Sequence, residues 1–426
     1  MNIFKMRIGR RSFDTNEKPW RTPWYIRIIE LSILVYYKAI TRFKINKVGV
    51  KGTKPPYLIL QNHASFMDFV QVGEFLLPRT CAFVCSIEQF IHREWLLRSA
   101  GCIYKRRFTS DLTVLKHILY VIRKKKKSVT IYPEARFSLA GITEEADLGT
   151  YARLIKLCKI PVVLGISKGN YIMSPQFAKH PYRKLPISAT FKLLFTKEET
   201  MYLPLEEIEK RLRENFHHDD YKYWQDSGVR IKSKHRAKNL HKILYQCPHC
   251  KKEFAMNSKG NTLYCGACGK EWTLNEYGYL QAKEGEVYFS HVPDWYKWER
   301  ENVKKQVESG EYRIETKARL EKIDSSAKGL KVLGKVNLVH DQNGFTVKGT
   351  LDNGKDFYFN RTVESMTGCH IEFNFHKKGD AIDLSDSHQT FFLFPYLYNH
   401  VTKIHFATEE LYKKNLREKE EKEKLK

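Results

Sequence analysis

Short apolar runs alternate with amphipathic stretches between about residues 47 and 215, and this alternation restricts the possible folds more than any other feature. Each run has the length of a buried strand, and the stretches between them, such as 111–127, have a helical pattern. Strands that alternate with helices predict a layered α/β domain with a mostly parallel sheet. The apolar runs are YLIL (57–60), CAFVC (81–85), CIY (102–104), VTIY (129–132) and PVVLGIS (161–167).

The composition favours a folded protein with an anionic partner. Of 426 residues, 42% are hydrophobic and 29% are charged, which excludes wholesale disorder. A chain of this length predicts about two to four domains. The formal net charge is +26. Such an excess is typical of proteins that bind nucleic acid, an anionic lipid surface or a phosphorylated substrate.

We expect residues 1–46 to form a basic arm and an interfacial amphipathic helix. The most apolar segment, 24–43, is interrupted by charged residues, so a transmembrane helix is not expected. A wide apolar face headed by Trp20 and Trp24 is typical of a helix that lies in a membrane interface. A helix packed on its own domain is the alternative interpretation. The polar residues share one narrow stripe at the helical period, formed by Arg27, Glu30, Lys38 and Thr41.

The second half of the chain has a different pattern. We expect a basic linker over residues 216–243 and a zinc ribbon over 244–282. A β-rich accessory domain should follow over 283–412, and a charged tail over 413–426. In the accessory domain short alternating strands are separated by turn signals, among them Asn-Gly pairs, which favour hairpins. This pattern resembles a pleckstrin-homology barrel.

The first motif with chemical meaning is LQNHASFMDF (60–69), in which His63 stands five residues before Asp68. On a regular helix these side chains would point about 140° apart, so they can meet only if the backbone breaks between them. The end of the strand near Gln61 supplies that break. A carboxylate bonded to one ring nitrogen fixes the tautomer and leaves the other nitrogen as a base. Such a histidine is suited to deprotonating a hydroxyl near neutral pH.

This motif also has a purely structural interpretation. Ser65 and Asp68 are close to a capping box in which Asp replaces Glu, so Asp68 would only cap a helix. His63 would then be a loop histidine whose hydrogen bonds are satisfied.

Three further blocks follow in order, and together with the first they resemble the glycerolipid acyltransferases of the 1-acyl-glycerol-3-phosphate type. In that family the blocks read NHxSxxD, GxIFIDR, FPEGTRS and VPVVPV. The resemblance covers about residues 50–215, and four blocks in order at reasonable spacing are poorly explained by chance. The three later blocks here are GCIYKRR (101–107), YPEARFSLAG (132–141) and IPVVLGIS (160–167).

The resemblance implies a role for each matching residue. It implies that His63 is the general base and that Asp68 orients it. It implies substrate-binding roles for Arg107, Glu134 and Arg136, because arginines can hold the acceptor's phosphate bidentately. Glu134 would accept a substrate hydroxyl or hold an arginine. The base would deprotonate the acceptor hydroxyl as it attacks an acyl thioester, so no Ser or Cys nucleophile is expected.

The sequence departs from the family at three places. Arg106 stands where the second block usually has Asp, and Gly165 replaces the second proline of the fourth block. The third block reads PEARFS, so Arg136 comes one place early. Either Arg136 still reaches the phosphate, or the register of the loop is shifted. Plain surface charge is the alternative interpretation of Arg106 and Arg107.

The cysteines predict a structural metal site. CPHC (247–250) and CGAC (265–268) are spaced as two zinc knuckles, with Cys247, Cys250, Cys265 and Cys268 as ligands. Four sulfurs close the coordination shell, so Zn2+ would be structural. Reduced buried thiols or a redox pair are the alternatives. The five other cysteines are scattered, which is typical of a reducing cytosol.

The resemblance therefore implies an enzyme, an O-acyltransferase of phospholipid synthesis. It would move a fatty acyl group from acyl-CoA or acyl carrier protein to lysophosphatidic acid or a related lysophospholipid. We expect it to sit on an anionic membrane at the cytoplasmic face, as a peripheral or monotopic protein.

Two other functions stay open at this point. A membrane adaptor with a degenerate acyltransferase domain would explain the altered second and third blocks. A nucleic-acid-binding zinc-ribbon protein would explain the charge and the basic segment 229–242, but it leaves the four blocks unexplained. Nucleic acid is therefore not the expected partner.

Overall fold

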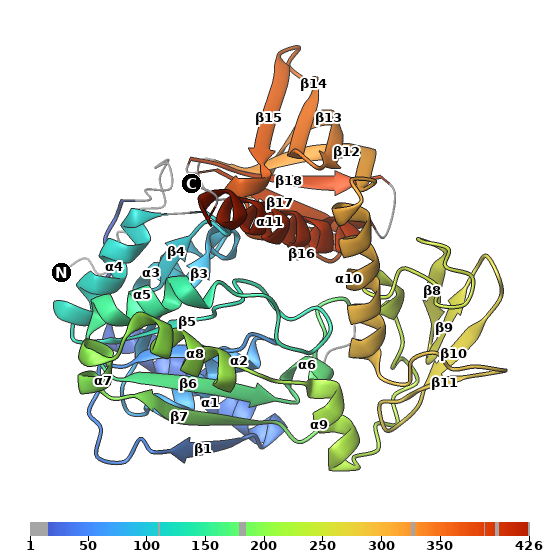
Figure 1. Cartoon of the computed structure of the whole chain (residues 1–426). Helices are drawn as coiled ribbons and strands as arrows, with labels where there is room; N and C mark the ends of the chain where they lie inside the picture. Colours follow the sequence, from blue (N-terminus) through green and yellow to red (C-terminus); the bar gives the residue numbers. More distant parts are fainter. Residues whose placement is uncertain are drawn as a thin grey trace.

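The structure, a computed structural model, describes residues 16–109, 111–178, 185–324, 329–386, 388–396 and 400–424. Residues 1–15 of the predicted basic arm and 425–426 of the predicted tail lie outside the described residues. The described chain contains an α/β layer, a small four-stranded sheet and a second seven-stranded sheet, joined by long helices (Figure 1).

The first sheet has the strand order β1-β7-β6-β2-β5-β3-β4. The strands from β6 to β4 run parallel, β7 is antiparallel to β6, and β1 is parallel to β7. The predicted α/β domain with a mostly parallel sheet is thereby confirmed. The strands are β1 (Lys44–Val48), β2 (Leu58–Gln61), β3 (Cys81–Ser86), β4 (Ile103–Lys105), β5 (Ser128–Ile131), β6 (Val162–Lys168) and β7 (Ser188–Phe195).

Helices cover both faces of this sheet because successive residues of its strands point to opposite sides. Leu58 and Leu60 of β2 pack against α4, α5 and α8, whereas Ile59 packs against α2. The helices are α1 (Trp24–Thr41), α2 (Met67–Leu76), α3 (Glu94–Ser99), α4 (Leu112–Arg123), α5 (Leu148–Cys158), α6 (Asn170–Met173), α7 (Lys197–Tyr202), α8 (Leu205–Asn215) and α9 (Asp220–Ser227).

Helix α1 lies on α2 with its polar stripe turned toward the protein. Arg27 donates to the carbonyl oxygen of Pro78 at 2.6 Å, and Lys38 pairs with Glu74 of α2. Large apolar side chains of α1 are left exposed; Trp24 is 73% exposed and Val35 60%. Among the described residues, the helices are all too short or too polar to cross a membrane.

The segment predicted as a basic linker, 216–243, is packed rather than exposed. It contains α9 and a short 3-10 turn (Leu240–Lys242). Trp224 and Leu240 are fully buried, and the Asp220 carboxylate accepts hydrogen bonds from the backbone of Gly169 and Tyr171. The basic residues of this segment dominate its composition, while a few apolar side chains between them fix it to the core.

The small sheet carries the cysteine pairs. Its strands are antiparallel in the order β11-β10-β9-β8. The elements are β8 (Met256–Lys259), β9 (Thr262–Cys265), β10 (Glu271–Leu274) and β11 (Leu280–Ala282).

The second large sheet is antiparallel and has the order β15-β14-β13-β12-β18-β17-β16. This confirms the predicted β-rich C-terminal region. The likeness to a pleckstrin-homology barrel and the domain boundaries stay predictions. The elements are α10 (Val292–Glu308), β12 (Arg313–Ile323), β13 (Leu330–Asp341), β14 (Gly344–Thr350), β15 (Asp356–Thr362), β16 (His370–Glu372), β17 (Ala381–Ser385), β18 (Thr390–Pro395) and α11 (His400–Lys424).

One buried apolar core joins these parts. It runs from Ala64 and Tyr171 of the α/β layer through Leu240 and Trp272 to Leu411 of α11. Figure 1 shows α11 beneath the second sheet, and α10 between that sheet and the four-stranded sheet. The C-terminal elements are therefore packed onto the α/β layer and are not tethered beside it.

Candidate active site

The four sequence blocks meet at one edge of the parallel sheet. His63 follows β2, Arg107 follows β4, Glu134 follows β5 and Ser167 ends β6. The carboxyl ends of parallel strands lie at the same edge, which is where open α/β sheets place their ligands. The structure therefore brings together residues that the sequence separates by more than a hundred positions.

The predicted break between His63 and Asp68 is present. Strand β2 ends at Gln61, and α2 begins at Met67, so Asp68 lies in the first turn. The Nδ1 atom of His63 lies 2.9 Å from Oδ2 of Asp68. This is hydrogen-bond distance, so the geometry required of a base and its orienting acid is met.

Asp68 is held on both of its oxygens. Oδ2 also accepts hydrogen bonds from the backbone N–H groups of Ala64 and Ser65, at 2.7 and 2.9 Å. Oδ1 accepts from Ser167 Oγ at 3.0 Å and from Asn170 Nδ2 at 2.6 Å. Because Oδ2 acts as an acceptor toward the loop, Nδ1 of the imidazole is the donor to it. Asp68 thus shapes the loop and orients the ring, and the second nitrogen, Nε2, keeps its lone pair.

The imidazole of His63 sits among aromatic rings. It stacks on Tyr132 with a centroid distance of 3.8 Å, and it contacts Phe137 at 4.1 Å and Phe69 at 5.4 Å. Burial lowers the pKa of His63, although the hydrogen bond to Asp68 opposes this shift. The ring is therefore neutral near pH 7, which is the form that can accept a proton. The buried hydroxyl of Tyr132 has no hydrogen-bond partner among the described residues.

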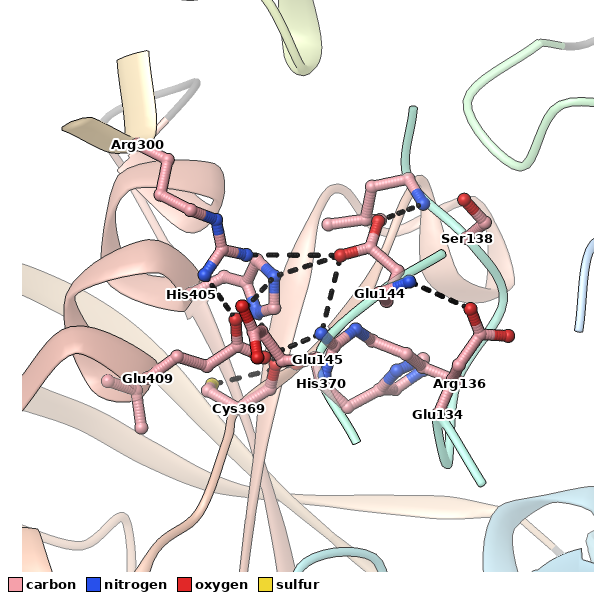
Figure 2. Close-up of polar contacts among 12 residues, drawn as sticks. Glu134, Arg136, Ser138, Glu144, Glu145, Arg300, Cys369, His370, His405 and Glu409 are labelled. Atoms are coloured by element: carbon pink, nitrogen blue, oxygen red, sulfur yellow. Dashed lines mark hydrogen bonds and ion pairs between the residues drawn. The ribbon is translucent and has the colours of Figure 1, made fainter. Parts of the chain in front are cut away.

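Glu134 supports His63 through the backbone. Its Oε2 accepts from the N–H of His63 at 2.7 Å. Its Oε1 accepts from the N–H of Glu144 at 2.8 Å (Figure 2). The N–H of Ser138 in turn donates to the carbonyl of His63 at 2.7 Å. Burial raises the pKa of Glu134 to about 8. Both carboxyl oxygens of Glu134 accept from backbone N–H groups, and one of these belongs to His63. Glu134, in the third block, therefore holds the backbone of the first block in place.

Arg136 lies in a buried ion network that reaches the C-terminal helix. Its Nη2 contacts Glu409 of α11 at 2.5 Å and Glu144 at 3.4 Å. Arg300 of α10 also pairs with Glu409, at 2.7 Å, and Figure 2 shows both guanidinium groups converging on this carboxylate. These contacts hold the pKa of Glu409 well below its usual range despite burial. The charge of Arg136 is neutralised by the protein itself.

Arg107 is also enclosed by carboxylates. It pairs with Glu88, with Asp383 at 3.3 Å and with Glu372 at 3.5 Å. The last two belong to the C-terminal sheet. Its neighbour Arg106 donates to the carbonyl oxygen of His388 at 2.8 Å. Neither arginine is plain surface charge. Glu88, His370 and Glu372 are grouped closely enough to ligate a metal ion, but the guanidinium of Arg107 already provides the cation there.

Several residues that act at this site were not singled out from the sequence. Asn62 holds Ser167, whose N–H donates to the Asn62 side chain at 2.7 Å, and Gln71 holds Asn170. The position of Asn62 beside His63 and of Ser167 at the end of the fourth block could have pointed to them. Nothing in the local sequence could have identified Glu372, Asp383 or Glu409, because they act from a distant sheet and helix.

The four predicted cysteine ligands lie together. Sγ of Cys247 lies 3.8 Å from Sγ of Cys268, and Sγ of Cys250 lies 3.7 Å from Sγ of Cys265. All four sulfurs lie within 4.8 Å of one another. Zn–S bonds of about 2.3 Å in a tetrahedron place sulfurs about 3.8 Å apart, so the cluster fits a closed four-sulfur metal site.

Comparison with known proteins identifies the segment that carries the blocks. Residues 42–164 match the sequence model of a family described as Acyltransferase, which confirms the resemblance found from the blocks. A similar solved structure is the 1-acyl-sn-glycerophosphate (LPA) acyltransferase from Thermotoga maritima. It is 16% identical, the similarity covers 45% of this chain and 74% of that chain, and the TM-score is 0.34. The search of curated proteins gave no match.

Proposed function

We propose that the acyltransferase segment at residues 42–164 makes this chain a lysophospholipid O-acyltransferase. It moves a fatty acyl group from a thioester donor to the free hydroxyl of lysophosphatidic acid or a related lysophospholipid, in phospholipid synthesis. The observation that carries the proposal is the pair of His63 and Asp68 at 2.9 Å, inside the matched segment, with Nε2 of the imidazole left as an acceptor.

In the proposed reaction His63 acts as the general base. Its Nε2 takes the proton of the acceptor hydroxyl while the oxygen attacks the thioester carbonyl. The tetrahedral intermediate then collapses, the C–S bond breaks, and the imidazolium returns the proton to the leaving thiolate. Asp68 stabilises the imidazolium through Nδ1, as in other histidine–carboxylate pairs. Holding hydroxyl, thioester and base together supplies much of the rate.

The exposed face of α1 supports membrane attachment. Trp24, Val35 and Tyr36 are each more than half exposed, and Trp95 stacks beside α1 on Tyr25 at 6.4 Å. Contiguous exposed apolar surface of this kind marks interaction sites, and a lipid surface fits the aromatic side chains. We propose that this face lies in the membrane interface as a monotopic or peripheral contact, and that the membrane face concerned is the cytoplasmic one.

An aromatic path leads from this face to the base. Tyr37 of α1 contacts Phe66 at 5.6 Å, Phe66 contacts Phe69 at 5.9 Å, and Phe69 contacts His63. Phe66 is half exposed and lies next to the membrane-facing side chains. These ring contacts form an apolar row between α1 and the imidazole, which supports entry of an acyl chain from the lipid.

The donor and the metal are also part of the proposal. Acyl-CoA or acyl carrier protein supplies the thioester, because both present a thiolate leaving group. Zn2+ occupies the four-cysteine cluster and serves to fold the ribbon. With four sulfur ligands it offers no open position for chemistry.

A membrane adaptor is the second candidate function, because Arg107 and Arg136 are both paired with carboxylates of the protein. Lipid mass spectrometry separates the two functions. Purified protein is mixed with vesicles that contain lysophospholipids and with several acyl thioesters, and the diacyl products are identified.

We expect His63→Ala and Asp68→Asn to lower the turnover by about 10²–10⁴-fold, the usual contribution of a general base. Vesicle binding and zinc content should persist. The exposed His217→Ala is the matched control and should retain full turnover. Equal turnover in His63→Ala and the wild type would exclude the base assignment, and vesicle binding without any product would favour the adaptor.

A further inference from the structure

Two of the three acids around Arg107, Glu372 and Asp383, come from neighbouring strands of the C-terminal sheet. In the β16–β17 pair, His370 lies opposite Asp383. Because strand residues alternate between faces, His370, Glu372 and Asp383 share the face that meets the α/β layer. Nε2 of His370 lies 2.9 Å from Oε1 of Glu372 and so helps to orient it. This hairpin delivers two acids to the arginine that closes the second block.

The third block has no arginine facing the base. The family pattern PEGTRS places its arginine at the position that is Phe137 in PEARFS. The Phe137 ring contacts the imidazole of His63 at 4.1 Å, whereas Arg136 points to Glu144 and Glu409. Ala135 stands where the family pattern has glycine, and its positive φ of 55° lies in the left-handed region that glycine adopts most easily. The loop therefore keeps its register, and the residue beside His63 has become apolar.

These pairings belong to a permanent interface. A Cβ added to Gly368 would lie 2.8 Å from the ring of Phe108, the residue after Arg107, so the two segments are fitted to each other at close range. The buried core also continues across this contact, from Leu139 to Leu411. Freeing the arginines by separating these parts would expose that core to water, which is costly.

The region around Arg107 is unfavourable for an added anion. One guanidinium faces the carboxyl groups of Glu88, Glu372 and Asp383, all with little exposure. Burial raises the pKa of Asp383 to about 8 although Arg107 opposes the shift, so the single guanidinium already fails to keep every acid of this buried cluster ionised. A phosphate dianion placed here would add like charge to a desolvated cluster.

We propose that the acceptor is a lipid hydroxyl whose head group carries no phosphomonoester, and that Glu372 and Asp383 set this specificity by occupying Arg107. The inference rests on the proposed acyltransferase function and changes its acceptor class: lysophosphatidic acid is excluded, and neutral acylated polyols join the lysophospholipids that carry no phosphomonoester. A neutral polyol or zwitterionic head group avoids the repulsion, and polyol hydroxyls can donate hydrogen bonds to the carboxylates.

The test uses the full chain and acceptors with the same acyl chain. Lysophosphatidic acid, lysophosphatidylcholine and monoacylglycerol are compared by kcat/KM in neutral vesicles. The kcat/KM for lysophosphatidic acid should be about tenfold or more below that of the better of the other two acceptors. The reason is that acidic groups of the site repel the phosphate of this substrate. The other two acceptors distinguish a zwitterionic from a neutral head group. Free sn-glycerol 3-phosphate should not compete with the acceptor.

A variant that replaces the carboxyl groups of Glu372 and Asp383 with amides tests whether these two acids set the acceptor specificity. Glu372→Gln with Asp383→Asn keeps the size of both side chains and frees Arg107 from two carboxylates. We expect the KM for lysophosphatidic acid to fall about tenfold, with kcat little changed and no gain for monoacylglycerol. Asp356→Asn removes an exposed acid of the same sheet and should change neither value.

Three outcomes would overturn the proposal. In the first, lysophosphatidic acid is the best acceptor of the wild type, and Arg107→Gln raises the KM for this acceptor but not for the other two. That result would show that Arg107 binds phosphate, while the acyltransferase function stands. An unchanged KM in the double variant would remove the role assigned to the acids. If no acceptor is acylated, in the wild type as in His63→Ala, the proposed function itself fails.

Discussion

At the scale of single residues, one carboxylate does two tasks. Asp68 accepts two backbone N–H groups of the loop that carries His63, and it also accepts from the imidazole. Asp68 thus binds the backbone of the loop as well as the ring, whereas α2 begins after Phe66 without a side-chain cap. Because one carboxylate holds both the loop and the ring, the folded chain itself sets the orientation of the imidazole.

The pH dependence of the reaction should reveal the buried imidazole. A base works in its deprotonated form, so a lowered pKa of His63 extends activity to lower pH. The acid limb of kcat/KM should lie below about 6.5, the ordinary value for histidine. The pH–rate profile with a saturating thioester measures it. His217→Ala should leave the limb in place, and a limb at or above the ordinary value would contradict the burial argument.

At the scale of elements, α1 reverses the usual arrangement of an amphipathic helix. Ile26 and Leu34 are its buried residues. The charged side chains Arg27 and Lys38 reach partners in and after α2, and most other apolar side chains of α1 are open. The sequence revealed the stripe but not its direction. Arg27 donates to the carbonyl oxygen of Pro78, just after α2, and Lys38 pairs with Glu74 of α2, so much of the apolar side of α1 is left exposed.

Replacing apolar side chains of α1 should weaken membrane binding. In the variant Trp24→Ser with Val35→Ser and Tyr36→Ser, apolar area is lost from the exposed face without touching the buried core. We expect vesicle affinity to fall by about tenfold or more, because membrane affinity scales with buried apolar area. Co-sedimentation with anionic vesicles measures it. Tyr202→Ser removes an exposed ring from α7, and equal losses in both variants would refute the assignment.

The ribbon makes a separate prediction about metal and stability. Cys265→Ser removes one of four ligands, so the zinc content should fall well below one ion per chain. The melting temperature should fall too, since zinc binding stabilises such folds directly. Elemental analysis and calorimetry measure the two effects. Cys158→Ala changes a buried thiol outside the cluster and should keep the metal. A variant that retained full zinc would contradict the ligand set.

At the scale of the whole molecule, buried charges connect distant parts of the chain. Arg136 and Arg300 share Glu409, and Glu144 closes the network from the α/β layer (Figure 2). A buried pair adds little net stability over an apolar contact, but removing one partner leaves an unpaired charge in the interior. Such a network favours one arrangement of α10 and α11 on the α/β layer, because any other arrangement would leave these charges unpaired.

Glu409→Gln should therefore destabilise the protein strongly. It leaves the buried guanidinium of Arg136 and the partly buried guanidinium of Arg300 short of a counter-charge, and the expected cost is about 3–5 kcal/mol in the free energy of unfolding. Denaturant titration measures it. Glu418→Gln changes an exposed acid farther along α11 and should lie within about 0.5 kcal/mol of the wild type. Similar values for the two variants would show that the network is not coupled to folding.

Local features were predictable because they depend on short stretches of chain. The strand runs, the break after Gln61, the helix over Trp24–Thr41 and the two cysteine knuckles each follow from neighbouring residues. The segment 216–243 shows the limit of this approach. Its charge suggested an exposed linker, whereas the burial of Trp224 and Leu240 depends on surfaces that other parts of the chain provide.

By itself, the sequence determined the layered α/β architecture, the histidine with its neighbouring acid, and the four sulfurs of the ribbon. Only the tertiary structure decided what the arginines do. Arg107 meets Asp383 across 276 positions and Arg136 meets Glu409 across 273, so no local pattern could foretell their partners. The physical reason is that a buried guanidinium needs a counter-charge, and the tertiary structure decides which carboxylates lie near enough to provide it.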